Sequence, residues 1–303
     1  MLFRSWLTVH FGFHDFAASG VVHGIAGIFA LGVLFNLGPR VGKYDDDGGT
    51  RAFKPHNLHM TLMGLMIIFT AFYAFYAACL AVLPGEAPGW NTIYYNPTTL
   101  GAITYTITIA FAGGFMGGYI CSKGDPFWTL SGGLAGVIAV SSGADVYAPS
   151  LTYLLAFAGA AFAVWIGTWQ DKKMRVDDAV GAVAVHGWTG MLGVLFMGIF
   201  ASGYPTGGFS GNVRVTILGQ LVGIATFIPL AFLSGYAISW VLKRANLLRV
   251  PLEVELEGLD LAEFGTDFYP DFAATEEVIV EADGTEVPAA PILVRAASQV
   301  IRG

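Results

Sequence analysis

Two stretches of the chain share one pattern: DFAASGVVHGIAG over Asp15–Gly27 and DAVGAVAVHGWTG over Asp178–Gly190. In both, seven residues separate an aspartate from a histidine that lies in Val-His-Gly-x-x-Gly. The aspartate is expected to open a helix, because a carboxylate suits the free N–H groups and the positive dipole end of a helix N-terminus. The histidine then follows about two turns deeper, and the glycines leave room beside it.

The histidines of this repeat, His23 and His186, are the first candidates for a functional site. A lone buried histidine is as often structural, bonded to a carbonyl of a neighbouring helix. Two histidines at equivalent positions favour a pair that lines a pore or relays a proton, because an ionisable residue within a membrane span is by default functional. A neutral imidazole offers one donor and one acceptor, which suits a narrow passage for a small polar molecule.

Other chemistry is not indicated. Two histidines without a nearby carboxylate, cysteine or third histidine fall short of a usual metal-ligand set. No nucleophile–base constellation, nucleotide loop or haem ligand pair stands out, so neither an enzyme nor a bound cofactor is expected. Cys79 and Cys121 lie in apolar runs and are expected to be packing residues. No cleavable signal peptide is expected in the first fifteen residues, because they lack a small-residue cleavage pattern.

The composition places this repeat in a membrane protein. Hydrophobic residues make up 55% of the chain and charged residues 12%, about half the usual share of a soluble domain. A span needs about 20 mostly apolar residues. The sequence predicts an all-α fold with seven spans, at 16–37, 57–83, 98–121, 127–146, 149–169, 181–202 and 215–242.

The basic residues predict how the spans are oriented. Thirteen of the fifteen lysines and arginines fall on one side when the loops at 38–56, 122–126 and 170–178 and the tail after 243 lie in the cytoplasm. The N-terminus is then outside and the C-terminus inside a cell membrane. The two copies of the repeat run in opposite directions, which is typical of inverted repeats with a site near the bilayer midplane.

The chain divides into a membrane domain at 1–250 and a tail at 251–303. The tail holds twelve of the twenty-two acidic residues, which argues against a nucleic-acid partner. The stretch Glu253–Phe264 is expected to be a short helix docked on the membrane domain or a solvated arm. After Pro270 we expect poor order, with a turn at Asp283-Gly284.

These motifs together resemble the ammonium transporter (Amt/Mep/Rh) family. The segment Asp15–Arg40 is similar to the family's fifth helix, with its DFAGGxVVH motif, and Pro55–Leu58 looks like the PHNL that begins its sixth. Val176–Gly187 is similar to the VDDPxDxxxVHG of the tenth helix. In the tail, EGLDLAE at Glu257–Glu263 includes Glu257, Gly258, Leu259 and Asp260 and resembles the family's cytoplasmic tail.

The resemblance implies a homotrimeric channel with one pore per protomer, which passes ammonia derived from ammonium. His23 and His186 correspond to the twin histidines of the conduction path, Phe75 to a gate phenylalanine, and Asp15 to the buried acid of the outer vestibule. Cys79 stands at the position of the vestibule serine. The tail segment implies contact with a PII-type cytosolic protein, which leaves a second hypothesis open: a non-conducting sensor that signals through its tail.

The chain also departs from the family pattern. It begins just before the fifth of eleven family helices, so it does not contain the counterparts of the first four. Tyr76 replaces an asparagine, and Gly181 replaces the second acid of the tenth-helix motif. Three explanations stay open: another chain supplies four helices, the reading frame is truncated or mis-started, or the chain no longer conducts.

Overall fold

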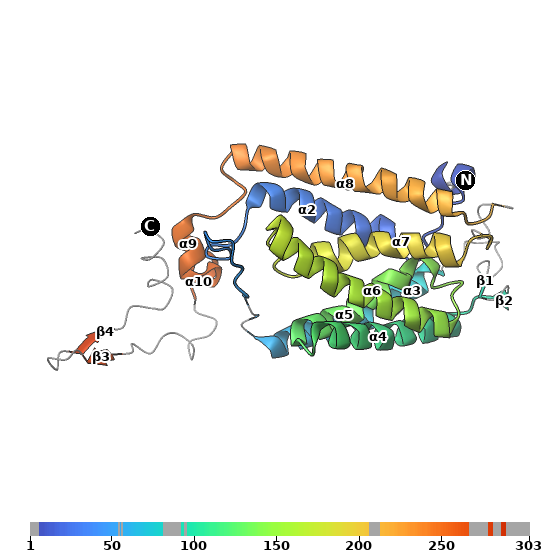
Figure 1. The fold of residues 1–303 in the computed structure, drawn as a ribbon, viewed down its shortest axis with the longest axis horizontal. Helices are drawn as coiled ribbons and strands as arrows, with labels where there is room; N and C mark the ends of the chain where they lie inside the picture. Colours follow the sequence, from blue (N-terminus) through green and yellow to red (C-terminus); the bar gives the residue numbers. More distant parts are fainter. Residues whose placement is uncertain are drawn as a thin grey trace.

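The structure is a computed structural model that describes residues 6–53, 55, 57–80, 92–93, 96–205, 213–266, 278–280 and 286–288 (Figure 1). Its long helices are α2 (Ile25–Leu37), α3 (Leu58–Cys79), α4 (Leu100–Ser122), α5 (Pro126–Val140), α6 (Pro149–Trp169), α7 (Thr189–Phe200) and α8 (Ile217–Arg244). Short helices are α1 (Trp6–Phe11), α9 (Leu252–Glu257), α10 (Leu259–Phe264) and the 3₁₀ turn η2 (Ser141–Gly143). Three segments are π-helical: η1 (Ser19–Gly24), η3 (Gln170–Met174) and η4 (Ala182–Trp188).

Strands make a very small contribution to the described residues. β1 (Thr92–Ile93) pairs antiparallel with β2 (Asn96–Pro97), and β3 (Val278–Val280) pairs antiparallel with β4 (Glu286–Pro288). The long elements are all helical, so the predicted all-α membrane class is confirmed.

Six helical stretches among the described residues are long and apolar enough to cross a membrane. They are Ser19–Leu37, Leu58–Cys79, Leu100–Ser122, Pro149–Met174, Ala182–Phe200 and Ile217–Arg244. They correspond to six of the seven predicted spans. The remaining prediction, 127–146, falls on α5, whose 15 residues are fewer than the roughly 20 that a span needs. The count of seven spans therefore stays a prediction.

Polar side chains fix where several helices begin. An N-cap oxygen that accepts a backbone N–H satisfies a donor that the first helical turn leaves unpaired. Helices α3, α4, α5 and α8 each have such a cap, with oxygen–nitrogen distances of 2.9–3.1 Å; the caps are Asn57, Thr99, Asp125 and Thr216. These four helix starts are thus encoded in the local sequence.

Glycines allow the helices to pack at short range. A Cβ at Gly113 in α4 would lie 2.4 Å from the carbonyl oxygen of Tyr153 in α6. At the next position of α4, a Cβ at Gly114 would lie 2.4 Å from the carbonyl oxygen of Gly132 in α5. Helices α4, α5 and α6 therefore form one tightly packed group, and α2 lies along α8 on the other side of α7 (Figure 1).

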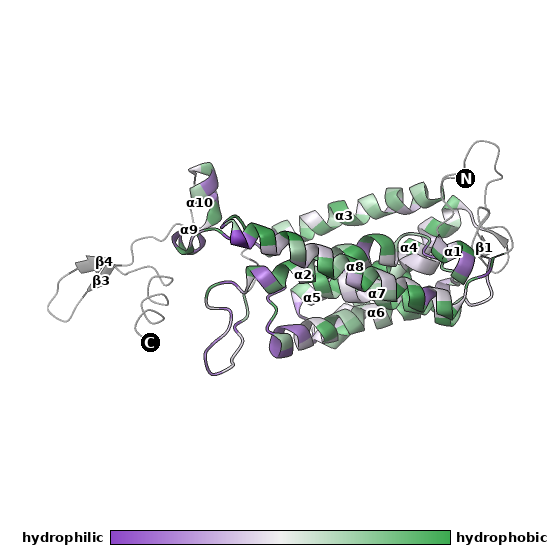
Figure 2. Ribbon diagram, turned by 90° about the horizontal axis from the view of Figure 1, so that it is seen from above, coloured by the Kyte–Doolittle hydropathy of each residue, from purple (hydrophilic) through white to green (hydrophobic). Residues whose placement is uncertain are grey.

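Helix α3 lies at the edge of this assembly. It contacts α4 and α5, and its buried side chains are Phe69, Phe72 and Tyr76. Its opposite face is apolar and open, with Met63 66% and Ile67 70% exposed. Seen from above, α3 is set apart from α2 and α8, and the hydrophilic residues gather toward the end that carries α9 (Figure 2).

The tail stretch Glu253–Phe264 forms two short helices instead of one. Gly258 separates α9 from α10 with a φ of +109°, which a residue with a side chain rarely adopts. The predicted turn at Asp283-Gly284 lies between β3 and β4 but outside the described residues, as does most of the segment after Pro270. His56 of the PHNL motif also lies outside them.

Candidate functional site

The first copy of the repeat begins with a turn that Asp15 stabilises. The Oδ2 atom of Asp15 accepts the N–H groups of Gly20 and Val21 at 3.0 and 2.9 Å, and Ser142 donates its hydroxyl to Oδ1 at 2.7 Å. The backbone of Ala18 is left-handed, with a φ of 60°. The helix consequently starts at Ser19, in π-helical form, instead of at the predicted residue 16.

The second copy begins in the same way. The Oδ2 atom of Asp178 accepts the N–H groups of Val183 and Ala184 at 2.9 and 3.1 Å, five and six residues along the chain as in the first copy. Gly181 has a φ of +73° at the position equivalent to Ala18. Each histidine therefore lies about one turn into its helix, so the predicted depth of two turns is wrong. Sequence periodicity gives no signal for a π-helical turn.

The glycines of the two motifs cross at the centre of the molecule. A Cβ at Gly27 would lie 2.1 Å from the backbone nitrogen of Gly187, and a Cβ at Gly190 would lie 2.7 Å from the nitrogen of Gly24. The first glycine of each motif thus packs against the second glycine of the other. This antiparallel crossing brings together the histidines that precede Gly24 and Gly187.

The structure places His23 and His186 in direct contact. Their Nδ1 atoms are 3.1 Å apart, and their ring centroids are 5.3 Å apart with an angle of 26° between the planes. Between neutral rings one Nδ1 carries the hydrogen and the other accepts it. The Nε2 atom of His23 is buried and has no hydrogen-bond partner among the described residues.

Two phenylalanines of α3 lie against His23. The ring of Phe72 stacks on the imidazole at 5.7 Å with an angle of 10°, and the ring of Phe75 meets it edge-on at 6.2 Å. Phe75 was predicted by register, and Phe72 was not. The spacing of three residues, which puts both rings on one face of a helix, was a signal that could have identified Phe72.

The other predicted residues of α3 lie farther along the helix. Cys79 is its last residue, and the thiol donates to the carbonyl of Phe75 at 3.3 Å. Tyr76 is fully buried; its hydroxyl donates to the carbonyl of Val137 at 3.0 Å and is hydrogen-bonded to Ser141. Tyr76 therefore fastens α3 to α5 and the turn that follows it.

An ion pair joins the end of the first copy's helix to the start of the second copy. Arg40, just after α2, donates from its backbone N–H, Nε and NH2 to the carboxylate of Asp177 at 2.9, 2.7 and 2.7 Å. Burial would raise the pKa of Asp177, but the hydrogen bonds and charge of Arg40 outweigh it and hold this pKa below its ordinary value. Asp177 precedes the capping acid Asp178, so α2 is tied to the start of η4.

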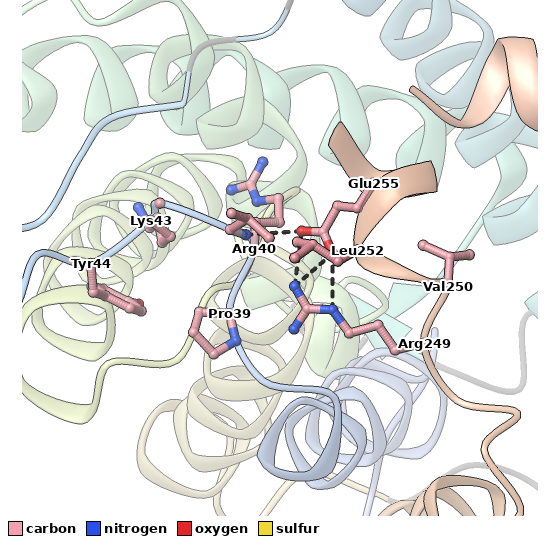
Figure 3. Close-up of a pocket in the computed structure, with 10 residues that line it drawn as sticks. Pro39, Arg40, Lys43, Tyr44, Arg249, Val250, Leu252 and Glu255 are labelled. Atoms are coloured by element: carbon pink, nitrogen blue, oxygen red, sulfur yellow. Dashed lines mark hydrogen bonds and ion pairs between the residues drawn. The ribbon is translucent and has the colours of Figure 1, made fainter. Parts of the chain in front are cut away.

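The tail contacts the same end of the molecule (Figure 3). Glu255 of α9 accepts the N–H of Val41 at 2.9 Å and forms a bidentate ion pair with Arg249 at 2.7–2.9 Å. Arg249 also donates to the carbonyl of Leu37, the last residue of α2. Of the predicted regulatory residues, Glu257, Leu259 and Asp260 are exposed and Gly258 is half-buried. The docked part of the tail is therefore α9, which is held at the end of α2 through Glu255, a residue that the sequence did not single out.

The described part of the chain contains no group of three or more His, Cys, Asp or Glu side chains that could hold a metal ion.

Comparison with known proteins gives one family. The model of the Ammonium Transporter Family matches residues 1–269. The chain is 34% identical over 276 residues to the ammonium transporter Amt2 of Archaeoglobus fulgidus, and 31% identical over 258 residues to Amt1 of Methanocaldococcus jannaschii. The matches cover 88% and 85% of this chain and 57% and 62% of those proteins. The chain thus spans about three fifths of the length of these curated relatives.

Solved structures that match this chain are also Amt and Mep proteins. A "Sensor Amt Protein" is 26% identical, with a TM-score of 0.73 over 86% of this chain and 62% of that one. The Mep2 structure from Candida albicans matches with a TM-score of 0.67 over 95% of this chain and 63% of that one; at 21% identity it supports the fold alone.

Proposed function

Because the chain belongs to the ammonium transporter family, we propose that it forms the histidine-lined part of a channel for ammonia derived from ammonium. The observation that supports this most strongly is the 3.1 Å contact between His23 and His186, carried by the two copies of the repeat. On this proposal the protein is a transporter and not an enzyme.

In this mechanism ammonium loses its proton at the outer mouth, and neutral ammonia crosses the apolar interior. A bare cation would lose its hydration there at a large cost in free energy, which favours a neutral solute. Phe75 gates the entry beside His23, Asp15 holds the outer start of η1, and Cys79 lines the vestibule. Ammonia then travels along the histidine pair, whose ring nitrogens take up the proton that ammonium lost and return it to ammonia on the cytoplasmic side.

The experiment is methylammonium uptake in a strain that lacks its own uptake system. The double variant His23→Ala/His186→Ala is expected to abolish uptake, because both polar groups of the path are removed. His59→Ala is the matched control, because His59 lies on the exposed part of α3. Unchanged uptake in the double variant, at equal amounts of protein in the membrane, would contradict the role proposed for the histidine pair.

The family resemblance also implies how the protein assembles. We expect a homotrimer in the cell membrane, with the tail in the cytoplasm. Native mass spectrometry of the detergent-solubilised protein measures the number of chains. Labelling of single cysteines introduced in the loop at 38–53 reports which side that loop faces.

A second candidate function is a sensor that signals through its tail. The contact that favours it is that of Glu255 in α9 with Val41, just after α2, because α2 continues at its other end from η1, which carries His23. A solved relative described as a sensor is consistent with it. Binding of a PII-type protein to the full chain, together with absent uptake, would support the sensor; normal uptake without binding would remove it.

A further inference from the structure

A buried histidine–aspartate pair outside the histidine pair has no role in the mechanism above. His14 is 5% exposed and Asp145 is fully buried. Nε2 of His14 donates to both carboxylate oxygens of Asp145, at 3.1 and 3.0 Å. Burying such a pair costs desolvation free energy that the attraction between the partners often does not recover, so stability alone is a weak reason for its presence.

His14 is fixed through its backbone as well as its side chain. The amide of Gln220 in α8, in the orientation that satisfies both groups, donates to the carbonyl of His14 at 3.1 Å and accepts its N–H at 2.8 Å. Thr98 donates its hydroxyl to the carbonyl of Asp145 at 2.8 Å. His14 thus lies between α8 on one side and the connection from α5 to α6 on the other.

The segment that follows His14 is the start of the first pore helix. The N–H groups of Phe16 and Ala17 donate to the carbonyls of Ser142 and Ser141, both at 3.0 Å. Ala18 then adopts its left-handed conformation, which is unfavourable for a residue with a side chain and needs support from its surroundings. The contacts on either side of Asp15 therefore decide where η1 begins and how it points.

The second copy of the repeat has an equivalent anchor. Asp177 stands immediately before the capping acid Asp178, as His14 stands before Asp15, and it too is paired, with Arg40. The residue before the capping aspartate is a histidine in the first copy and an aspartate in the second. A hydrogen-bonded side-chain pair at the same place in both copies indicates a requirement of the repeat itself: each of the two helices is fastened one residue before its capping aspartate.

We propose that His14 and Asp145 are positioning residues, which set η1 so that the imidazole of His23 meets that of His186. The contact between the two Nδ1 atoms has a narrow range of productive distances. A small displacement of η1 would break it without unfolding the helix. The effect on flux rests on the function proposed above, whereas the effect on the ring contact does not.

The test replaces the pair by an apolar pair of similar size. The double variant His14→Leu/Asp145→Leu leaves no unpaired buried charge and so is expected to fold. His14→Gln is the conservative control, because its amide can still donate to Asp145. We expect the apolar variant to lower the maximal methylammonium uptake per folded protein about 10-fold, with His14→Gln close to the wild type.

A second measurement reads the histidine contact directly. ¹⁵N spectra of histidine-labelled full-length protein in nanodiscs report the shared hydrogen of His23 and His186. We expect the apolar variant to lose this signal and His14→Gln to keep it. If the wild-type protein conducts nothing, the channel function fails while the spectra still decide the positioning role. Unchanged spectra in the apolar variant overturn the proposal, with or without flux.

Discussion

At the scale of single residues, the contact between two Nδ1 atoms constrains the tautomers of the pair. When both rings are neutral, the ring that donates through Nδ1 has an accepting Nε2, and its partner has a donating Nε2. His23 and His186 then present opposite hydrogen-bonding groups at their Nε2 atoms. Transfer of one proton through the pair exchanges these roles, so a second transfer in the same direction requires both tautomers to return first.

The two phenylalanines beside His23 differ in what their removal should do. Phe72 is 7% exposed and stacks on the imidazole, so Phe72→Ala leaves a cavity and is expected to cost about 3–4 kcal/mol of stability. Phe75 meets the ring edge-on and is partly exposed, so Phe75→Ala is expected to cost less stability and to widen the proposed gate. Thermal unfolding in detergent measures the first effect.

The gate is tested separately from stability. Phe75→Ala is expected to raise methylammonium uptake relative to ammonium uptake, because the larger solute gains most from a wider entrance. Phe72→Ala serves as the comparison with the same truncation three residues away. If the selectivity changed in Phe72→Ala and not in Phe75→Ala, the gate would have to be assigned to Phe72 instead of Phe75.

At the scale of elements, the crossing of α2 with η4 depends on glycine. A Cβ at Gly27 would overlap the backbone of Gly187, which cannot rotate away as a side chain can. We expect Gly27→Ala to push the helices apart, to cost about 1–3 kcal/mol of stability and to lower uptake. Unfolding in detergent and methylammonium uptake are the two measurements.

Gly64 provides the matched control for this substitution. It lies in α3, and a Cβ there would meet nothing within 4 Å. Alanine is favoured over glycine in a helix by about 1 kcal/mol, so Gly64→Ala should leave stability unchanged or slightly raised. Equal effects of the two alanine substitutions would contradict the close crossing of the two motifs.

At the scale of the whole molecule, the Arg40–Asp177 pair joins the end of α2 to the segment before η4 and should make stability depend on pH. The pKa of Asp177 lies below its ordinary value of 3.8. Its contribution is therefore complete above that ordinary value and is lost as the pH falls through the lowered one. The unfolding temperature in detergent should drop across this acidic range.

Asp177→Asn isolates the contribution of this carboxylate. The variant should be less stable than the wild type near neutral pH by about 2 kcal/mol, the usual scale for hydrogen bonds to a charged group. Its acid-induced loss of stability should be smaller than that of the wild type, because the carboxylate that would be protonated is absent. If the stability of the two proteins fell equally as the pH was lowered, other acidic residues would account for the acid-induced loss of stability.

The sequence alone determined the features that depend on neighbouring residues. Apolar runs of sufficient length predicted six spans that the structure contains, because a helix in lipid must be long and apolar within itself. The repeated motif identified His23 and His186, and its glycines indicated close packing. The sequence does not decide whether the tail docks or is solvated, because docking depends on the surface of the membrane domain that the tail meets.

Only the tertiary structure decided the contacts between distant segments. His14 meets Asp145 across 131 positions, Arg40 meets Asp177 across 137, and the histidines meet across 163. The late start of η1 has the same origin, because the serines after α5 fix the backbone of Phe16 and Ala17. No local pattern specifies such pairs, since each partner acquires its neighbour only when the helices pack.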